Sequence, residues 1–217
     1  MKILWWKIKR RTDRVSRTLF RRLLSLGEAE KQLVRLAMKK SFSRILVPEC
    51  RFAPLAIRVA KMQAKARVTA MDPSPEDLTI ASLKAFEAGV DIEFVRSAIS
   101  DNRIERGCFD LIAVGPDERG LTCISGDDVL AMRELLRPGG EIILGFFGFS
   151  RPIRAIVSAF PGCSQKGGRN RFHLQRADLE GLFAEAGLDP LEEALSFHLP
   201  FGAFHIYHGP VCWPEKQ

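Results

Sequence analysis

Long apolar runs are absent from this 217-residue sequence. None approaches the roughly 18 residues that a membrane-spanning helix needs, because arginine or aspartate interrupts each one. We do not expect a secretory leader either, since the basic start of the chain lacks a sustained apolar region and a small-residue cleavage site. These absences predict a cytoplasmic protein that is soluble or peripheral at a membrane.

Cysteine is sparse and irregularly spaced. The five cysteines are an odd number without a C-x-x-C pair, a pattern that predicts neither a disulfide framework nor a zinc site. His198, His205 and His208 lie close in sequence, but positions 205 and 208 differ by an odd step and would face opposite sides of a strand. We expect reduced, buried thiols and no metal site.

Acidic residues are scarce in the first part of the chain. Residues 1–42 hold 13 Lys and Arg against 3 Asp and Glu, net +10, whereas residues 43–217 hold 20 against 23, net −3. As a helix, residues 2–24 separate an apolar side with Trp5 from a side of Lys and Arg at steps of three and four. We predict a basic amphipathic helical segment over 1–42.

Three partners are conceivable for this segment: an anionic membrane surface, nucleic acid phosphates, or the sheet domain itself. For residues 2–24 we favour the membrane, because the apolar side carries tryptophans and the basic side lacks aromatics for base stacking. Nucleic acid is the less favoured partner. For residues 27–41, which carry both charge signs, a lid over the sheet is the favoured interpretation.

Short apolar runs alternate with helical patterns from Ser43 onward, which is typical of an α/β protein with a parallel sheet. Continuous hydrophobicity indicates strands that are buried on both faces. The expected strands are 44–49, 67–72, 92–98, 109–115 and 140–147, with helices at 54–63, 76–89, 126–136 and 176–187. Two further runs, 191–199 and 203–209, are joined by "PFG", a connection short enough for an antiparallel hairpin.

Four segments carry a family resemblance: "VTAMDPSPEDLTIASLKAFEAGVDIEFV" (68–95), "FDLIAVG" (109–115), "LLRPGGEIIL" (135–144) and "FHLQRADLEGLFAEAGL" (172–188). In order and spacing, the chain from 43 to about 210 resembles the class I S-adenosylmethionine-dependent methyltransferases. The resemblance implies a Rossmann-like domain over 43–217, with a doubly wound, seven-stranded, mostly parallel sheet and an antiparallel C-terminal strand. It also implies S-adenosylmethionine as the cofactor and methyl transfer as the activity.

The resemblance locates the cofactor loop in "ILVPECRFAP", residues 45–54. The family pattern there is acidic-x-Gly-x-Gly-x-Gly, whose glycines let the backbone approach the cofactor. In this chain the acidic position is Val47, and the glycine positions are Glu49, Arg51 and Ala53. We expect the large side chains at 49 and 51 to fill the methionine pocket or to force the turn into another path.

One acidic contact of the family is retained. Asp72 stands where the family carboxylate accepts both ribose hydroxyls, a role that needs two acceptor oxygens. At the adenine contact the chain has Ala98, with Asp101 as a shifted substitute. The cofactor-binding residues that the resemblance implies are Glu49, Cys50, Arg51, Asp72, Pro73, Ala98 and Gly115. It assigns no catalytic residue: His173 and Asp117 are polar residues of rim loops, more typical of solvated side chains.

Two functional interpretations remain open. In the first, a divergent methyltransferase binds ribose through Asp72 and pairs Glu49 or Arg51 with the ammonium or carboxylate of the cofactor. In the second, the bend "ECRFAP" is packed shut, Asp72 only caps the following helix, and the protein is a catalytically silent binding or scaffold module. Family resemblance favours methyl transfer.

The acceptor is expected to be a small or lipid-like molecule. Fifteen Phe stand against one Tyr, and several lie in "GFFGFS" and "FHLPFGAFHIYHG", near the expected substrate entrance. A quinone-like acceptor would suit such a wall, although Phe at strand ends is more often core. The connection 149–175 is the longest in the chain, and loops of that size are usually functional or mobile. The sequence indicates no oligomeric state.

Overall fold

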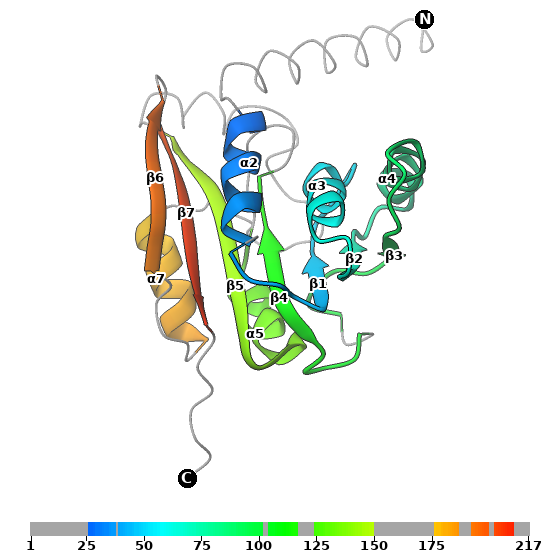
Figure 1. The fold of residues 1–217 in the computed structure, drawn as a ribbon. Helices are drawn as coiled ribbons and strands as arrows, with labels where there is room; N and C mark the ends of the chain where they lie inside the picture. Colours follow the sequence, from blue (N-terminus) through cyan, green and yellow to red (C-terminus); the bar gives the residue numbers. More distant parts are fainter. Residues whose placement is uncertain are drawn as a thin grey trace, which may run out of the picture.

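The computed structural model describes residues 26–37, 39–101, 104–116, 124–149, 176–186, 192–199 and 202–210. Seven strands form one sheet in the order β3-β2-β1-β4-β5-β7-β6 (Figure 1). They are β1 (Arg44–Val47), β2 (Arg67–Met71), β3 (Glu93–Val95), β4 (Phe109–Val114), β5 (Leu136–Phe149), β6 (Glu192–Leu199) and β7 (Gly202–Pro210). β1 to β5 pair in parallel, whereas β7 runs antiparallel to β5 and β6. The predicted doubly wound sheet with an antiparallel C-terminal strand is confirmed.

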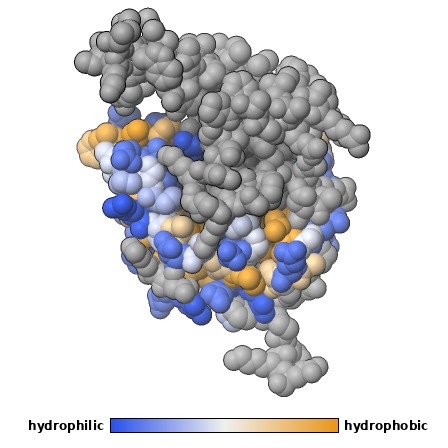
Figure 2. All heavy atoms as spheres, turned by 180° about the vertical axis from the view of Figure 1, so that it is seen from behind, coloured by the Kyte–Doolittle hydropathy of each residue, from blue (hydrophilic) through white to orange (hydrophobic). Residues whose placement is uncertain are grey.

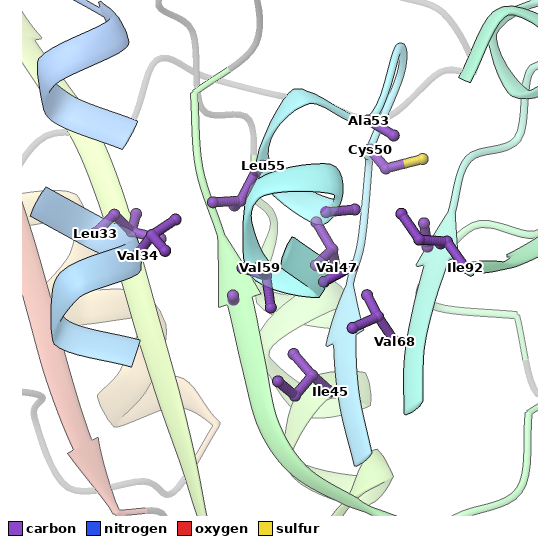
Figure 3. Packing of buried hydrophobic residues seen from close by; sticks show 14 of the residues in the cluster. Leu33, Val34, Ile45, Val47, Cys50, Ala53, Leu55, Val59, Val68 and Ile92 are labelled. Carbon is purple, nitrogen blue, oxygen red and sulfur yellow. The ribbon is translucent and has the colours of Figure 1, made fainter. Parts of the chain in front are cut away.

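Helices cover both faces of this sheet. One face carries α2 (Leu26–Ala37), α3 (Pro54–Met62) and α4 (Pro75–Glu87), and the other carries α5 (Gly126–Leu135) and α7 (Arg176–Glu185) (Figure 1). Because successive strand residues point to opposite faces, β1 serves both layers. Ile45 and Val47 pack in the cluster under α3 (Figure 3), and Leu46 packs in the cluster under α5.

Local signals fix the helix ends. Ser74 caps α4, since its Oγ accepts a hydrogen bond from the Asp77 N–H at 3.2 Å. Gly89, with φ 66°, closes the same helix in a left-handed conformation that glycine adopts without steric cost. At the start of α5, Ser125 and Asp128 exchange hydrogen bonds in a capping box.

The first helix of the described chain is part of the core. Leu33 and Val34 of α2 are 0% and 1% exposed, and both lie beside α3 in the packed layer (Figure 3). β5 makes room for this contact with a glycine, because a Cβ at Gly145 would lie 2.5 Å from Leu33 Cδ1. α2 therefore lies on the sheet, as the lid interpretation of 27–41 expects. Residues 2–24 lie outside the described residues.

β5 begins earlier than the expected strand 140–147. Leu136 follows α5 directly and pairs with Phe109 before the chain turns at Gly139, whose φ is 77°. The pairing register then shifts before the regular ladder to β4 resumes. The sequence pattern could not show this early pairing, because the Pro and Gly of the turn interrupt the apolar run.

Two buried carboxylates occupy the amino-terminal edge of the sheet. Asp110 accepts two backbone N–H groups at the start of β1, at 2.6 and 3.1 Å. Glu141 contacts Lys40 Nζ and, at 2.7 Å, His208 Nε2. Burial raises the pKa of Glu141, but the hydrogen bonds from Lys40 and His208 outweigh it and lower the pKa overall. These contacts attach the connection between α2 and β1 to the sheet.

Candidate functional site

The candidate site lies at the carboxyl ends of β1 and β2. From β1 the sheet continues to β2 in one direction and to β4 in the other, and ligands of open α/β sheets bind outside such a switch point. A bend over residues 48–53 crosses this edge between β1 and α3. The structure thus gathers here five of the implied residues, namely Glu49, Cys50, Arg51, Asp72 and Pro73.

Three residues of the bend have a left-handed backbone. The φ angles are 51° at Glu49, 45° at Arg51 and 55° at Ala53. These are the three positions at which the resemblance places glycine. The left-handed conformation costs a residue with a Cβ roughly 1–2 kcal/mol of steric strain. The bend therefore has the backbone conformation of a glycine-rich turn, although its three left-handed residues are not glycine.

Backbone hydrogen bonds fix the bend onto β2. The Cys50 N–H donates to Met71 O at 2.8 Å, and the Ala53 N–H donates to Cys50 O at 2.6 Å. The Cys50 side chain is buried, which raises the pKa of its thiol, and the nearby Asp72 carboxylate raises it further. A thiol that stays protonated is a poor nucleophile, so Cys50 contributes its backbone to the site.

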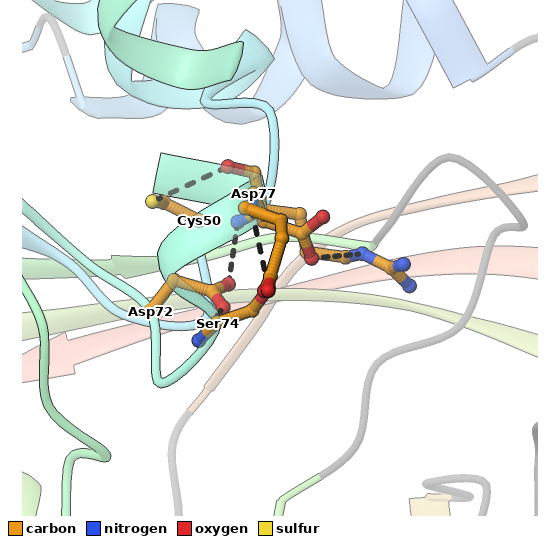
Figure 4. A network of polar contacts seen from close by, with 6 residues as sticks. Cys50, Asp72, Ser74 and Asp77 are labelled. Carbon is orange, nitrogen blue, oxygen red and sulfur yellow. Dashed lines mark hydrogen bonds and ion pairs between the residues drawn. The ribbon is translucent and has the colours of Figure 1, made fainter. Parts of the chain in front are cut away.

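Asp72, directly after β2, is a buried carboxylate that joins the bend to α4 (Figure 4). Its Oδ2 accepts the Arg51 N–H at 2.8 Å, and its Oδ1 accepts the Ser74 N–H at 2.9 Å. The residue is 4% exposed, and this burial raises its pKa despite the two hydrogen bonds. Each carboxylate oxygen has two lone pairs, so each Asp72 oxygen has the lone pairs for one further hydrogen bond.

The interpretation of Asp72 as the helix cap is wrong. Ser74 is the N-cap of α4, and Asp72 lies two residues earlier, where it holds the Ser74 N–H. The sequence contains the signal for the correct assignment, since Ser74 and Asp77 stand three residues apart before an apolar run.

The large side chains of the bend contact α4. Arg51 Nε lies 3.6 Å from Asp77 Oδ2, and its guanidinium carbon lies 5.9 Å from the centre of the Phe52 ring. Lys84 Nζ of α4 lies 4.8 Å from the same ring centre. Sequence reasoning missed Asp77 and Lys84 as partners of the bend, because no local pattern predicts which helix folds beside it.

Ala98 and Asp101 form a turn beyond β3. The Asp101 Oδ2 accepts the Ala98 N–H at 3.2 Å and the Ser97 hydroxyl at 3.3 Å. This turn ends the strand at Val95, short of the expected 92–98. The Asp101 carboxylate, expected as a substitute for the adenine contact, therefore binds its own turn.

Gly115 lies directly after β4, beside the first turn of α3. A Cβ at this position would lie 3.0 Å from Leu55 Cδ2, so the glycine permits α3 to approach β4. Asp117, His173 and residues 150–175 lie outside the described residues.

The C-terminal histidines make separate contacts. His205 Nδ1 lies 2.7 Å from Glu193 Oε1 and 3.1 Å from Ser196 Oγ. Because both partners approach the same ring nitrogen, these three residues are not an acid–base relay. His208, three residues further along β7, contacts Glu141. Within the described residues, no group of three or more His, Cys, Asp or Glu could hold a metal ion.

The predicted apolar wall is core wherever its side chains are described. Phe146 and Phe204 are 1% and 0% exposed, and Phe146 stacks on Tyr207 with ring centres 5.7 Å apart. The other phenylalanines of the two quoted runs lie outside the described side chains. No described helix has the length and apolar character to cross a membrane.

Sequence comparison finds distant relatives among curated methyltransferases. No protein-family model matches the chain. It is 30% identical over 121 residues to the Ubiquinone/menaquinone biosynthesis C-methyltransferase UbiE of Bdellovibrio bacteriovorus, an alignment covering 54% of this chain and 50% of that protein. The chain therefore spans about half the length of this curated relative.

Solved structures resemble the whole described sheet. The YcgJ protein of Bacillus subtilis aligns with a TM-score of 0.67 at 12% identity, covering 85% of this chain and 100% of that chain. A Burkholderia thailandensis 1,6-didemethyltoxoflavin-N1-methyltransferase, solved with 1,6-didemethyltoxoflavin and S-adenosylhomocysteine, aligns with a TM-score of 0.58 at 15% identity, covering 98% and 91%. Together with the strand order and the antiparallel β7, these similarities show that the chain has the class I S-adenosylmethionine-dependent methyltransferase fold.

Proposed function

We propose that this protein is an S-adenosylmethionine-dependent methyltransferase that acts on a small or lipid-like acceptor. The observation that carries the proposal is the left-handed bend at Glu49, Arg51 and Ala53, held against the buried Asp72 carboxylate. Strained conformations persist only where the surrounding structure holds them, and they are concentrated at ligand sites. Their coincidence with the three glycine positions of the fold's cofactor loop supports cofactor binding.

Bound S-adenosylmethionine would supply a methyl group on a positively charged sulfur. The contribution of the protein to such a transfer is chiefly positioning. Asp72 would accept the ribose hydroxyls through its remaining lone pairs, while the N–H groups of Arg51 and Ser74 keep its carboxylate in place. Because Asp77 engages the Arg51 side chain, Glu49 is the better partner for the ammonium group of the cofactor.

A hydrophobic acceptor is supported by the sequence comparison. The relative from Bdellovibrio bacteriovorus is named for ubiquinone and menaquinone biosynthesis. An acceptor of this class partitions into membranes, which agrees with the membrane surface that we propose as the partner of residues 2–24.

A catalytically silent binding module is the second candidate. It is favoured by the same carboxylate, since Asp72 is 4% exposed and both of its oxygens already accept backbone hydrogen bonds. In that case the bend and α4 close the site through the Arg51 and Asp77 ion pair, and the fold acts through its surface.

Isothermal titration of the full chain with S-adenosylmethionine and S-adenosylhomocysteine separates the two candidates. We expect micromolar binding that weakens at least about tenfold in Asp72→Asn, because one of the two charged acceptors is lost. Asp110→Asn is the matched control, since Asp110 is also a buried carboxylate that accepts two backbone N–H groups, but at the other edge of the sheet.

The absence of binding heat for the natural sequence at millimolar ligand would contradict the enzymatic proposal. A thermal-shift measurement checks this result independently, because a ligand at about 100 times its Kd stabilises the native state by about 2.7 kcal/mol. Equal weakening in the Asp72 and Asp110 variants would mean that both act only through overall stability.

A further inference from the structure

The outer surface of α2 and α3 concentrates positive charge. Between residues 31 and 71 the chain has ten Lys and Arg but one acidic residue, Glu49. Six of the cations recur at steps of three and four on the two helices and the turn after each. They form what we call the basic surface: Lys31, Arg35, Lys39, Arg58, Lys61 and Lys65.

The two helices present these cations together. α2 and α3 lie side by side on one face of the sheet (Figure 1), and Gln63 Nε2 donates to Lys40 O at 2.8 Å where both helices end. Leu33 of α2 and Val59 of α3 are fully buried on the sides that meet the sheet. Since buried and charged positions alternate with helical period, the basic surface lies on the side away from the core.

Little negative charge compensates the basic surface. Among the described side chains of α2 and α3, Glu28 is the one acidic group, and it lies 3.3 Å from Lys31. Within the described part of the chain, no carboxylate comes within ion-pair distance of Lys39, Lys61 or Lys65. α4, on the same face of the sheet, holds three acidic residues against one basic one, and α5 and α7, on the other face, hold six against two. Among the described helices, the excess of cations is therefore confined to α2, α3 and the turns after them.

Apolar side chains are exposed in the same helical layer. Met62, next to Lys61, is 49% exposed, and Phe86, Leu83 and Ile80 of α4 are 85%, 60% and 40% exposed. Figure 2, which shows the molecule from behind, has a group of hydrophobic atoms at the end that carries α4. Exposed aliphatic groups beside lysines match the interface of an anionic membrane, where apolar groups enter and cations meet headgroups.

We propose that the basic surface docks the folded domain onto an anionic lipid bilayer. Nucleic acid fits less well, because neither α2 nor α3 contains an aromatic residue on which a base could stack. The basic segment 2–24 immediately precedes α2 in the sequence, so the positive charge of the two regions is continuous along the chain. The proposal is independent of cofactor binding, because none of its residues lies in the candidate site.

The test is partition of the full chain onto phosphatidylcholine vesicles with and without phosphatidylglycerol. We expect binding only with phosphatidylglycerol, and a fall of at least about tenfold in Lys61→Glu/Lys65→Glu, since each lysine near an anionic surface contributes about fivefold. The matched control is Arg96→Glu/Arg106→Glu, which changes the net charge equally at exposed positions outside the basic surface. This control is expected to bind within about twofold of the natural sequence.

Three outcomes would overturn the proposal. The first is no binding of the natural sequence to anionic vesicles. The second is an equal loss in both double variants, which would mean that only net charge matters. The third is unchanged vesicle binding of Lys61→Glu/Lys65→Glu together with lost binding to a short RNA duplex. Titration with S-adenosylmethionine, run on the same samples, reports failure of the proposed methyltransferase function separately.

Discussion

The backbone N–H of Arg51 donates a hydrogen bond to Asp72 Oδ2 at 2.8 Å. Through this bond the carboxylate after β2 fixes the shape of the bend after β1. The residue that the resemblance assigns to ribose thus also holds the loop that would surround the rest of the cofactor. A change of charge at Asp72 is therefore expected to alter the bend as well as the ribose contact.

Replacing a strained residue by glycine tests the conformation of the bend. Glu49→Gly should raise the free energy of unfolding by about 1 kcal/mol, because glycine adopts the φ of 51° without the Cβ clash. Glu87→Gly, the same change within α4, should instead lower it by up to about 1 kcal/mol. Urea unfolding measures both, and equal destabilisation would show that position 49 is not strained.

The stability contributed by Asp72 should depend on pH. Burial raises the pKa of Asp72 in the folded protein above the ordinary 3.8. Protonation of Asp72 therefore stabilises the folded protein. This stabilisation is complete below the unfolded-state pKa and is lost as the pH rises through the folded-state pKa. The free energy of unfolding of the natural sequence, minus that of Asp72→Asn, should fall as the pH rises above the ordinary pKa of 3.8. Urea titrations at several pH values measure it; a difference that rises with pH would contradict the assignment.

Glu141 should show the opposite pH dependence. Although burial raises its pKa, contacts with Lys40 and His208 lower the pKa below the ordinary 4.5. Its stabilisation is present above the unfolded-state pKa and is lost as pH falls through the folded-state pKa. Glu141→Gln should cost about 1–3 kcal/mol at neutral pH and progressively less in acid. Unfolding experiments at several pH values on the natural sequence and on Glu141→Gln measure the difference in their free energies of unfolding. A difference that does not vary with pH would mean that the charge of Glu141 is unimportant.

Packing of α2 on β5 can be tested at a single glycine. Gly145→Ala should lower the free energy of unfolding by about 1–3 kcal/mol, because the new Cβ would meet Leu33 at 2.5 Å and Phe204 at 2.8 Å. Gly181→Ala in α7 is the control, since a Cβ there meets nothing within 4 Å, and it should add about 0.5–1 kcal/mol. Thermal unfolding compares the two; a tolerated alanine at 145 would argue against the contact.

Part of the site was predictable and part was not. Asp72 was predictable, because it follows a recognisable buried strand and lies within a segment that resembles the family. The left-handed conformation of Glu49, Arg51 and Ala53 was not, because these residue types favour right-handed or extended backbone. Hydrogen bonds of Cys50 and Arg51 with the end of the next strand help to hold the bend in this shape.

The sequence by itself determined the kind and order of the helices and strands, since the spacing of apolar residues fixes which local structure can bury them. It also determined the excess of cations before residue 72. Tertiary structure alone decided that Asp72 accepts the Arg51 N–H, that Asp77 draws the Arg51 side chain toward α4, and that the cations of α2 and α3 form one surface. These relationships join segments distant in sequence, and they exist only once the sheet sets which helices are neighbours.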